Sequence, residues 1–183
     1  MIALLLVSVQ GCDLFQTRDP EPPSQGTSGN QPATDHGIVM SNLRTAIFEN
    51  NVENYLRCFS DTSVRTYLFV PSPEEQIKFS QWDLDAERRY FVAMGSALRP
   101  GAAMSLSDSI ITRSVSAGTA IYSLHYTLFV PHQEAGVPRL VQGNMDLYFA
   151  EDSRVHLWSI YKWVDTKTTS DSTWSYLRAW FNR

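Results

Sequence analysis

Four titratable side chains in the second half of the chain are candidates for proton transfer: Asp108, His125, Asp146 and Asp165. Such an acid or base works best in an apolar cavity, where its pKa can approach the working pH. The alternation of apolar and polar residues places His125 and Asp146 on the outward face of neighbouring strands, where the two could pair in a surface contact. Asp108 could face inward unless a bulge turns it out, and Asp165 stands at a strand end, which suits a cap or turn partner. The pattern therefore predicts no catalytic residue.

Nucleophilic and metal chemistry find little support either. Cys58 lies on a short run with helical spacing, without an accompanying hydrolase motif, and we interpret it as a small buried hydrophobe. The four histidines, at 36, 125, 132 and 156, have no short ligand spacing, and no Cys pair is available for a structural zinc. The sequence also lacks a glycine-rich phosphate cradle. We therefore expect neither a metal nor a cofactor.

The elements that would position a site are mostly strands. Period-two alternation predicts an antiparallel meander of three long strands, at 119–130, 138–150 and 154–165. The alternation in the last of these is ambiguous, so that strand is either buried on both sides or changes register at a bulge. Other elements are predicted from helical spacing and β-rich runs: helices near 39–50, 52–59, 85–98 and 172–181, and strands near 64–70 and 103–115.

Aromatic side chains are the best candidates for lining a pocket. The inward face of 119–130 carries Tyr122 and Tyr126. The other candidates come from the helix at 85–98 and from the last strand: Phe91, Trp158, Tyr161 and Trp163. For each of the six, ordinary core packing is the more common role, and a Tyr or Trp in a pocket would need a partner for its polar atom.

The N-terminus reads as a targeting segment. Residues 2–9 are almost wholly apolar, about the length of the hydrophobic part of a secretory signal. The run ends in Val9-Gln10-Gly11-Cys12, which resembles the lipobox of bacterial lipoproteins, although no Lys or Arg precedes Cys12. The resemblance implies a signal peptide over 1–11, cleavage before Cys12 and lipidation of that residue.

Residues 12–37 form a Pro-, Ser- and Gly-rich stretch that is typical of a flexible tether, and we assign His36 to it. A lipid on Cys12 would leave Cys58 without a disulfide partner. The expected location is therefore the bacterial cell envelope, with the membrane as a partner through the lipid. The net charge of −4 does not favour nucleic acid, which requires clustered Lys and Arg.

The order of elements resembles one known family. It is accompanied by short phrases along the chain: Glu49-Asn50-Asn51 before Tyr55-Leu56, Phe69-Val70-Pro71 before Trp82, Trp158-x-Ile160 with Trp163-x-Asp165, and Thr173-Trp174-Ser175. These phrases are similar to those of bacterial lipoproteins with a nuclear transport factor 2-like (NTF2-like, or SnoaL-like) domain, which would span 38–183. The resemblance implies an α+β cone: a strongly curved antiparallel sheet wrapped around N-terminal helices, with a short C-terminal helix.

Two functions are compatible with this reading. The first is a non-catalytic module that binds a small apolar ligand or a protein partner. The second is a small-molecule isomerase or dehydratase that uses general acid–base catalysis in the cone pocket. By resemblance, the exposed sheet face would also suit a homodimer, with Tyr148 and Phe129 on that face. An open pocket with a buried carboxylate or His beside a Tyr would favour the enzyme, and a cavity filled by Tyr and Trp side chains would rule the enzyme out.

Overall fold

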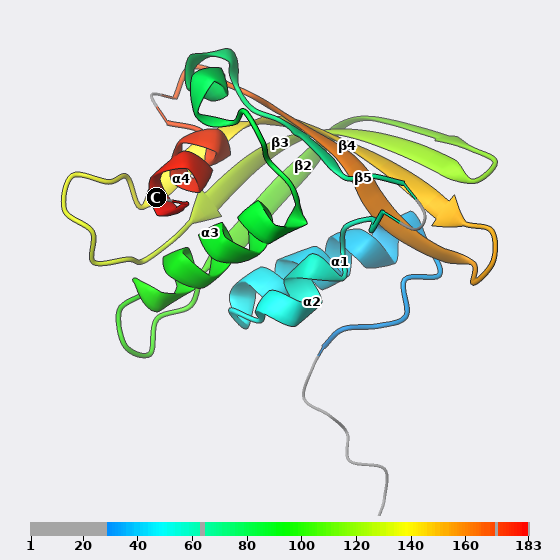
Figure 1. Ribbon diagram of the computed structural model, residues 1–183, viewed down its shortest axis with the longest axis horizontal. Helices are drawn as coiled ribbons and strands as arrows, with labels where there is room; N and C mark the ends of the chain where they lie inside the picture. The colour runs from blue at the N-terminus through cyan, green and yellow to red at the C-terminus, as the bar shows by residue number, and fades with distance from the viewer. Residues whose placement is uncertain (1–28, 63–64, 171, 183) are drawn as a thin grey trace, which may run out of the picture.

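The computed structural model describes residues 29–62, 65–170 and 172–182, so Cys12 and the expected signal peptide lie outside the described residues. Figure 1 shows the elements along the chain. The helices are α1 (His36–Phe48), α2 (Val52–Leu56), the 3₁₀ helix η1 (Pro73–Lys78), α3 (Leu84–Ser96) and α4 (Trp174–Phe181). The strands are β1 (Leu68–Val70), β2 (Ser105–Ser116), β3 (Thr119–Phe129), β4 (Leu140–Asp152) and β5 (Leu157–Thr166). No described helix is long and apolar enough to cross a membrane.

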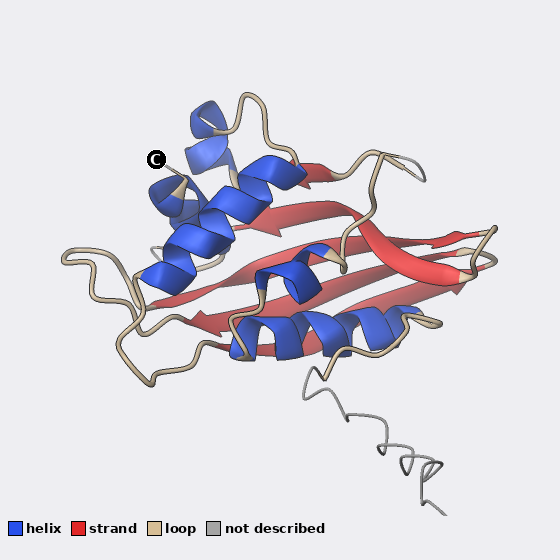
Figure 2. Cartoon of the chain, turned by 60° about the horizontal axis from the view of Figure 1, so that its bottom comes forward, coloured by secondary structure: helices blue, strands red, loops and turns tan. Residues whose placement is uncertain are grey.

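The strands form one curved, unclosed sheet in the order β1-β5-β4-β3-β2. β2 to β5 are an antiparallel meander, as predicted, whereas the short β1 runs parallel to β5. The helices lie on one side of the sheet, with α1 and α2 beside its strands and α3 continuing the helical layer toward α4 (Figure 2). The predicted α+β fold with N-terminal helices and a short C-terminal helix is therefore confirmed.

The predicted faces of the central strands are confirmed by their register. Tyr122 pairs with Leu147 and Tyr126 with Gly143, and the side chains of Tyr122, Leu147 and Tyr126 are buried. His125 pairs with Asn144 on the opposite face, where both side chains are partly exposed. The period of two thus divides these strands into an interior face and an outer face.

Bulges explain the two irregular strands. In β5 the register shifts between Tyr148 and Phe149 of β4, and Tyr161 is the extra residue. The expected change of register is therefore the correct alternative for β5. In β2 the shift falls between Ile110 and Thr112, beyond the expected position near Asp108.

Residues 29–35, expected to be part of the tether, contact the domain. Gln31 donates its amide to Asn42 Oδ1 at 2.9 Å, and Asn42 Nδ2 donates to Gln31 O at 2.7 Å. The Trp158 amide donates to Ala33 O at 2.7 Å. Asp35 then caps α1 by accepting from the Gly37 amide at 2.6 Å.

The assignment of His36 to the tether is wrong. His36 is the first residue of α1 and is buried against Tyr122, whose hydroxyl lies 2.5 Å from His36 Nδ1. The ring also packs edge-on against Trp158, with centroids 5.1 Å apart. A lone His in a polar, Pro-rich stretch gave no sign of this packing, because its partners come from β3 and β5.

Candidate functional site

A buried ion pair joins Glu87 of α3 to Arg178 of α4. Arg178 Nε lies 3.2 Å from Glu87 Oε1 and 3.3 Å from Oε2, and both side chains are 0% exposed. Charges taken out of water to this extent are stabilised only by close partners. The two helices that supply them also pack on each other, so the pair joins α3 to the C-terminal end of the chain.

Three further donors occupy the Glu87 carboxylate. Tyr67 Oη donates to Oε1 at 2.8 Å, Trp82 Nε1 donates to Oε1 at 2.9 Å, and Tyr55 Oη donates to Oε2 at 3.0 Å. Burial raises the pKa of Tyr55 and Tyr67 well above the ordinary value, and the negative charge of Glu87 raises it further, so both hydroxyls stay protonated. A carboxylate has about four lone-pair sites. Together with Arg178, these donors leave Glu87 no free site for a substrate proton.

Aromatic rings enclose the Arg178 guanidinium. Its central carbon lies 4.0 Å from the centroid of Phe69 and 4.1 Å from that of Trp163, within cation–π range. Burial lowers the pKa of Arg178, but the Glu87 charge and the surrounding tyrosine side chains together outweigh burial, and the net pKa is raised well above its ordinary value. The buried Arg178 side chain is therefore a permanent cation within an aromatic cage.

A second buried network surrounds Asp165. Tyr126 Oη donates to Asp165 Oδ1 at 2.7 Å, and the Ser175 amide donates to Asp165 Oδ2 at 2.7 Å. Because Thr173, the residue before α4, makes no side-chain cap bond, the carboxylate on β5 takes over that role. The expectation that Asp165 is a cap partner is confirmed.

Four of the six predicted pocket residues are buried and packed against other side chains. Phe91 stacks on Tyr55 with centroids 4.0 Å apart, and Trp163 packs edge-on against Trp174 at 4.6 Å. Tyr122 and Tyr126 have the buried hydrogen-bond partners described above. Their polar atoms are satisfied within the protein, with the exception of Trp163 Nε1, for which the described residues supply no partner.

The other two predicted residues lie apart from each other. Trp158 is half-buried and borders an open pocket. The Tyr161 ring lies beneath the Arg65 guanidinium, and its centroid is 6.1 Å from that of Tyr148 on the outer face. The six candidates therefore do not form one site.

The remaining titratable candidates have structural partners. His125 Nδ1 lies 3.1 Å from Asn144 Oδ1, while Asp146 pairs with Ser123, so the suggested contact between His125 and Asp146 is wrong. The Asp108 side chain faces inward. Its Oδ1 and Oδ2 accept hydrogen bonds from Arg44 Nε and Nη2 at 2.6 and 2.8 Å. Burial raises the pKa of the Cys58 thiol to about 12, in keeping with a buried hydrophobe. The described residues contain no group of three or more side chains that could hold a metal ion.

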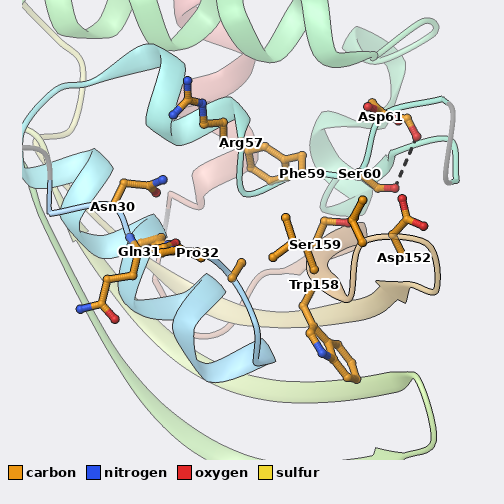
Figure 3. A pocket seen from close by; sticks show the side chains of 14 residues that line it. Asn30, Gln31, Pro32, Arg57, Phe59, Ser60, Asp61, Asp152, Trp158 and Ser159 are labelled. Atoms are coloured by element: carbon orange, nitrogen blue, oxygen red, sulfur yellow. Dashed lines mark hydrogen bonds between the residues drawn. The ribbon is translucent and has the colours of Figure 1, made fainter.

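An open pocket of about 280 Å³ lies between the N-terminal segment and β5. Figure 3 shows Asn30, Gln31 and Pro32 on one side of it and Asp61 and Asp152 on the other. Its apolar lining includes Pro32, Ala33, Phe59, Val155, Leu157 and Trp158. Asn30 Oδ1 is buried there without a hydrogen-bond partner among the described residues. Sequence reasoning missed this pocket because one of its walls, residues 30–33, was assigned to the tether.

The similarity to known proteins lies in the fold and not in the sequence. The sequence matches no protein-family model and no curated protein. Among solved structures it is similar to a proposed scytalone dehydratase from Novosphingobium aromaticivorans DSM 12444, with 15% identity, a TM-score of 0.56, and 73% of this chain and 83% of that chain covered. It is also similar to a conserved protein from Planctomyces limnophilus DSM 3776, with 10% identity, a TM-score of 0.54, and coverage of 70% and 89%.

An NTF2-like protein of unknown function from Shewanella oneidensis MR-1 has the same arrangement, with 10% identity, a TM-score of 0.52, and coverage of 73% of this chain and 98% of that chain. The chain therefore has the NTF2-like fold. Identities this low carry the fold alone, since one fold hosts many functions.

Proposed function

We propose that this chain is a non-catalytic binding domain that takes a small, largely apolar ligand in the pocket between residues 30–33 and β5. The single observation that carries the proposal is the state of the interior. Glu87 and Arg178 pair within it, with neither side chain exposed, and Glu87 also accepts hydrogen bonds from Tyr55, Tyr67 and Trp82. Opening this region to a substrate would separate a buried ion pair, which costs about 3–5 kcal/mol in typical proteins.

The pocket beside β5 has the chemistry that a small ligand needs. Its volume of about 280 Å³ stands near the lower end of the range for small-molecule sites. Phe59, Leu157 and Pro32 offer apolar contacts, and the polar lining residues Asp61, Asp152 and Ser159 offer acceptors for an N–H or O–H donor. A compact apolar molecule with a single donor group suits this lining.

We further propose that a lipid on Cys12 holds the domain at the bacterial cell envelope. Residues 30–33 both border the pocket and lead back toward Cys12 along the chain, so the ligand site would lie close to where the tether joins the domain. The proposal rests on the lipobox-like sequence, since Cys12 lies outside the described residues.

A small-molecule dehydratase or isomerase is the second candidate. One observation favours it: a buried carboxylate, Glu87, lies next to two tyrosine hydroxyls, as general acid–base chemistry in a cone would require. The similarity to a proposed scytalone dehydratase points the same way, at the level of fold. Against it, each Glu87 oxygen already accepts a hydrogen bond from a buried tyrosine hydroxyl.

A neutral fluorescent dye with one N–H group, N-phenyl-1-naphthylamine, tests the proposal directly. We expect its fluorescence to rise on binding the protein, and Leu157→Asn to weaken binding by about tenfold through lost apolar contact. Leu140→Asn is the matched control, because Leu140 has similar exposure on β4, away from the pocket. Equal binding by both variants would place the dye elsewhere and remove the support for this pocket.

A further inference from the structure

Three described segments of the chain cover the outer edge of β5. Ala33 O accepts a hydrogen bond from the Trp158 amide at 2.7 Å, and Cys58 O accepts one from the Ile160 amide at 2.8 Å. β1 then pairs with residues 162–164 of the same strand. Amides that lie close together on β5 are therefore held by segments from different parts of the chain.

The first of these segments, residues 30–33, is also one wall of the pocket (Figure 3). None of these four residues is fully buried: Asn30 and Ala33 are partly exposed, and Gln31 and Pro32 are exposed. Ala33 packs against the core. A segment that buries so little side-chain surface opens more readily than the strands beside it, because few apolar contacts are lost when it leaves.

Asn42 of α1 holds this pocket wall in place. Its Oδ1 accepts from the Gln31 amide at 2.9 Å, and its Nδ2 donates to Gln31 O at 2.7 Å, so one side chain binds both backbone groups of that residue. Asn42 is 5% exposed and stands in the interior of α1, where Asn is not a favoured helix former. Asp in its place would keep the acceptor and lose the donor, and Leu would lose both.

We propose that the pocket wall opens and closes independently of the rest of the fold, and that Asn42 is the positioning residue that sets this balance. A ligand that contacts the wall would stabilise the closed form, and the closed form would in turn complete the ligand site. The independent opening rests on the contacts of Asn42 and β5. The coupling to a ligand rests in addition on the function proposed above.

Hydrogen exchange of single amides, followed by NMR in the full chain carrying Cys12→Ser, measures the opening. After correction for intrinsic rates, we expect the Trp158 amide to exchange at least tenfold faster than the Ile160 amide, because only the former has its acceptor on the wall. Asn42→Leu should accelerate the Trp158 amide by about a further tenfold, since two hydrogen bonds are lost, and leave the Ile160 amide unchanged. Asn42→Asp should have an intermediate effect, because it keeps the acceptor for the Gln31 amide.

Leu43→Ala is the matched control on α1. Leu43 is fully buried and does not line the pocket, so this variant should destabilise the domain without accelerating the Trp158 amide more than the Ile160 amide. Circular dichroism checks that the variants fold, and Asn42→Asp carries the test if Asn42→Leu does not. Equal exchange of the two amides in the parent protein overturns the independent wall, as does equal acceleration of both by the Asn42 variants.

The dye N-phenyl-1-naphthylamine tests the coupling. If it binds only when the wall is closed, a free concentration ten times its Kd should slow the Trp158 amide by about tenfold. Bound dye with an unchanged Trp158 rate overturns the coupling. Dye that does not bind at all contradicts both the proposed function and the coupling, whereas the exchange rates of the Asn42 variants still decide whether the wall opens independently.

Discussion

Tyr126 on β3 and Asp165 on β5 are joined across β4 by one buried hydrogen bond of 2.7 Å. The same Tyr126 hydroxyl accepts from the Trp174 amide at 2.7 Å, at the first residue of α4. One side chain therefore sets both the spacing of two strands and the start of the helix that carries Arg178. The bond passes over Gly143, the residue of β4 that pairs with Tyr126.

Gly143→Ala should disturb this contact. A Cβ at Gly143 would lie 2.7 Å from Tyr126 Oη and 2.8 Å from Thr166 O, closer than real Cβ contacts. We expect a loss of about 1–3 kcal/mol in the free energy of unfolding, measured by urea denaturation. In a Tyr126→Phe background the additional loss should be smaller, because the clashing hydroxyl is gone. An unchanged urea midpoint would contradict the described packing.

Removing one partner of the buried ion pair should cost far more than removing an exposed one. Arg178→Met leaves Glu87 buried without its cation, and we expect a loss of about 3–5 kcal/mol. A double variant with Glu87→Leu as well should be less destabilised than the sum of the two single variants. Arg88→Ala is the control: Arg88 pairs with Glu53 on the surface and should have little effect. Strict additivity of Glu87→Leu and Arg178→Met would show that the two charges do not act as a pair.

Stability should fall in alkali. Burial raises the pKa of Tyr55 and Tyr67 well above the ordinary value of 10.0. Below that value both residues are protonated in the folded and the unfolded chain, and their contribution is constant. Above it only the unfolded chain loses these protons, so the free energy of unfolding decreases as pH rises.

Tyrosinate absorbance and circular dichroism, followed together from about pH 9 to 12, measure this effect. We expect fewer than the 8 tyrosines of the chain to ionise before the structure is lost, and the rest to ionise together with unfolding. Ionisation of all tyrosines in the folded protein would disprove the burial of these hydroxyls.

Lipidation has its own test. We expect the parent protein to fractionate with membranes and to incorporate labelled fatty acid, and Cys12→Ser to do neither. Cys58→Ser is the matched control, because its buried thiol should not be a lipidation site. If Cys12→Ser leaves both fractionation and labelling unchanged, the anchor is not at Cys12.

The parts of the fold that follow from local pattern could be predicted from the sequence. Alternation in β3 and β4 placed Tyr122 and Tyr126 inside and His125 outside, because each position depends only on its neighbours in the strand. Asp165 at a strand end was identified as a cap partner, although the helix that it caps, α4, could not be named from its position alone.

The interior could not be predicted in the same way. Glu87 and Arg178 are 91 residues apart, and each stands in a helix where a charged residue is normally solvated. The hydrophobic periodicity of the two helices does not indicate that both side chains face the interior. The pocket beside β5 was missed for a related reason. Asn30 and Pro32 lie in a stretch whose composition is typical of a linker, and they form one wall of a pocket only because they pack opposite β5.

The covering of β5 by Ala33, by residues 58–60 and by β1 has a kinetic consequence. All three segments precede β5 by a large part of the chain, so each contact closes a long loop. Folding rates fall as the sequence separation of contacting residues grows. During synthesis, α1, α2 and α3 would leave the ribosome before β5 does. The segments next to these helices that pair with β5 would therefore lack their partner until then. The nascent N-terminal half would therefore wait, incompletely packed, for nearly the whole chain to be synthesised.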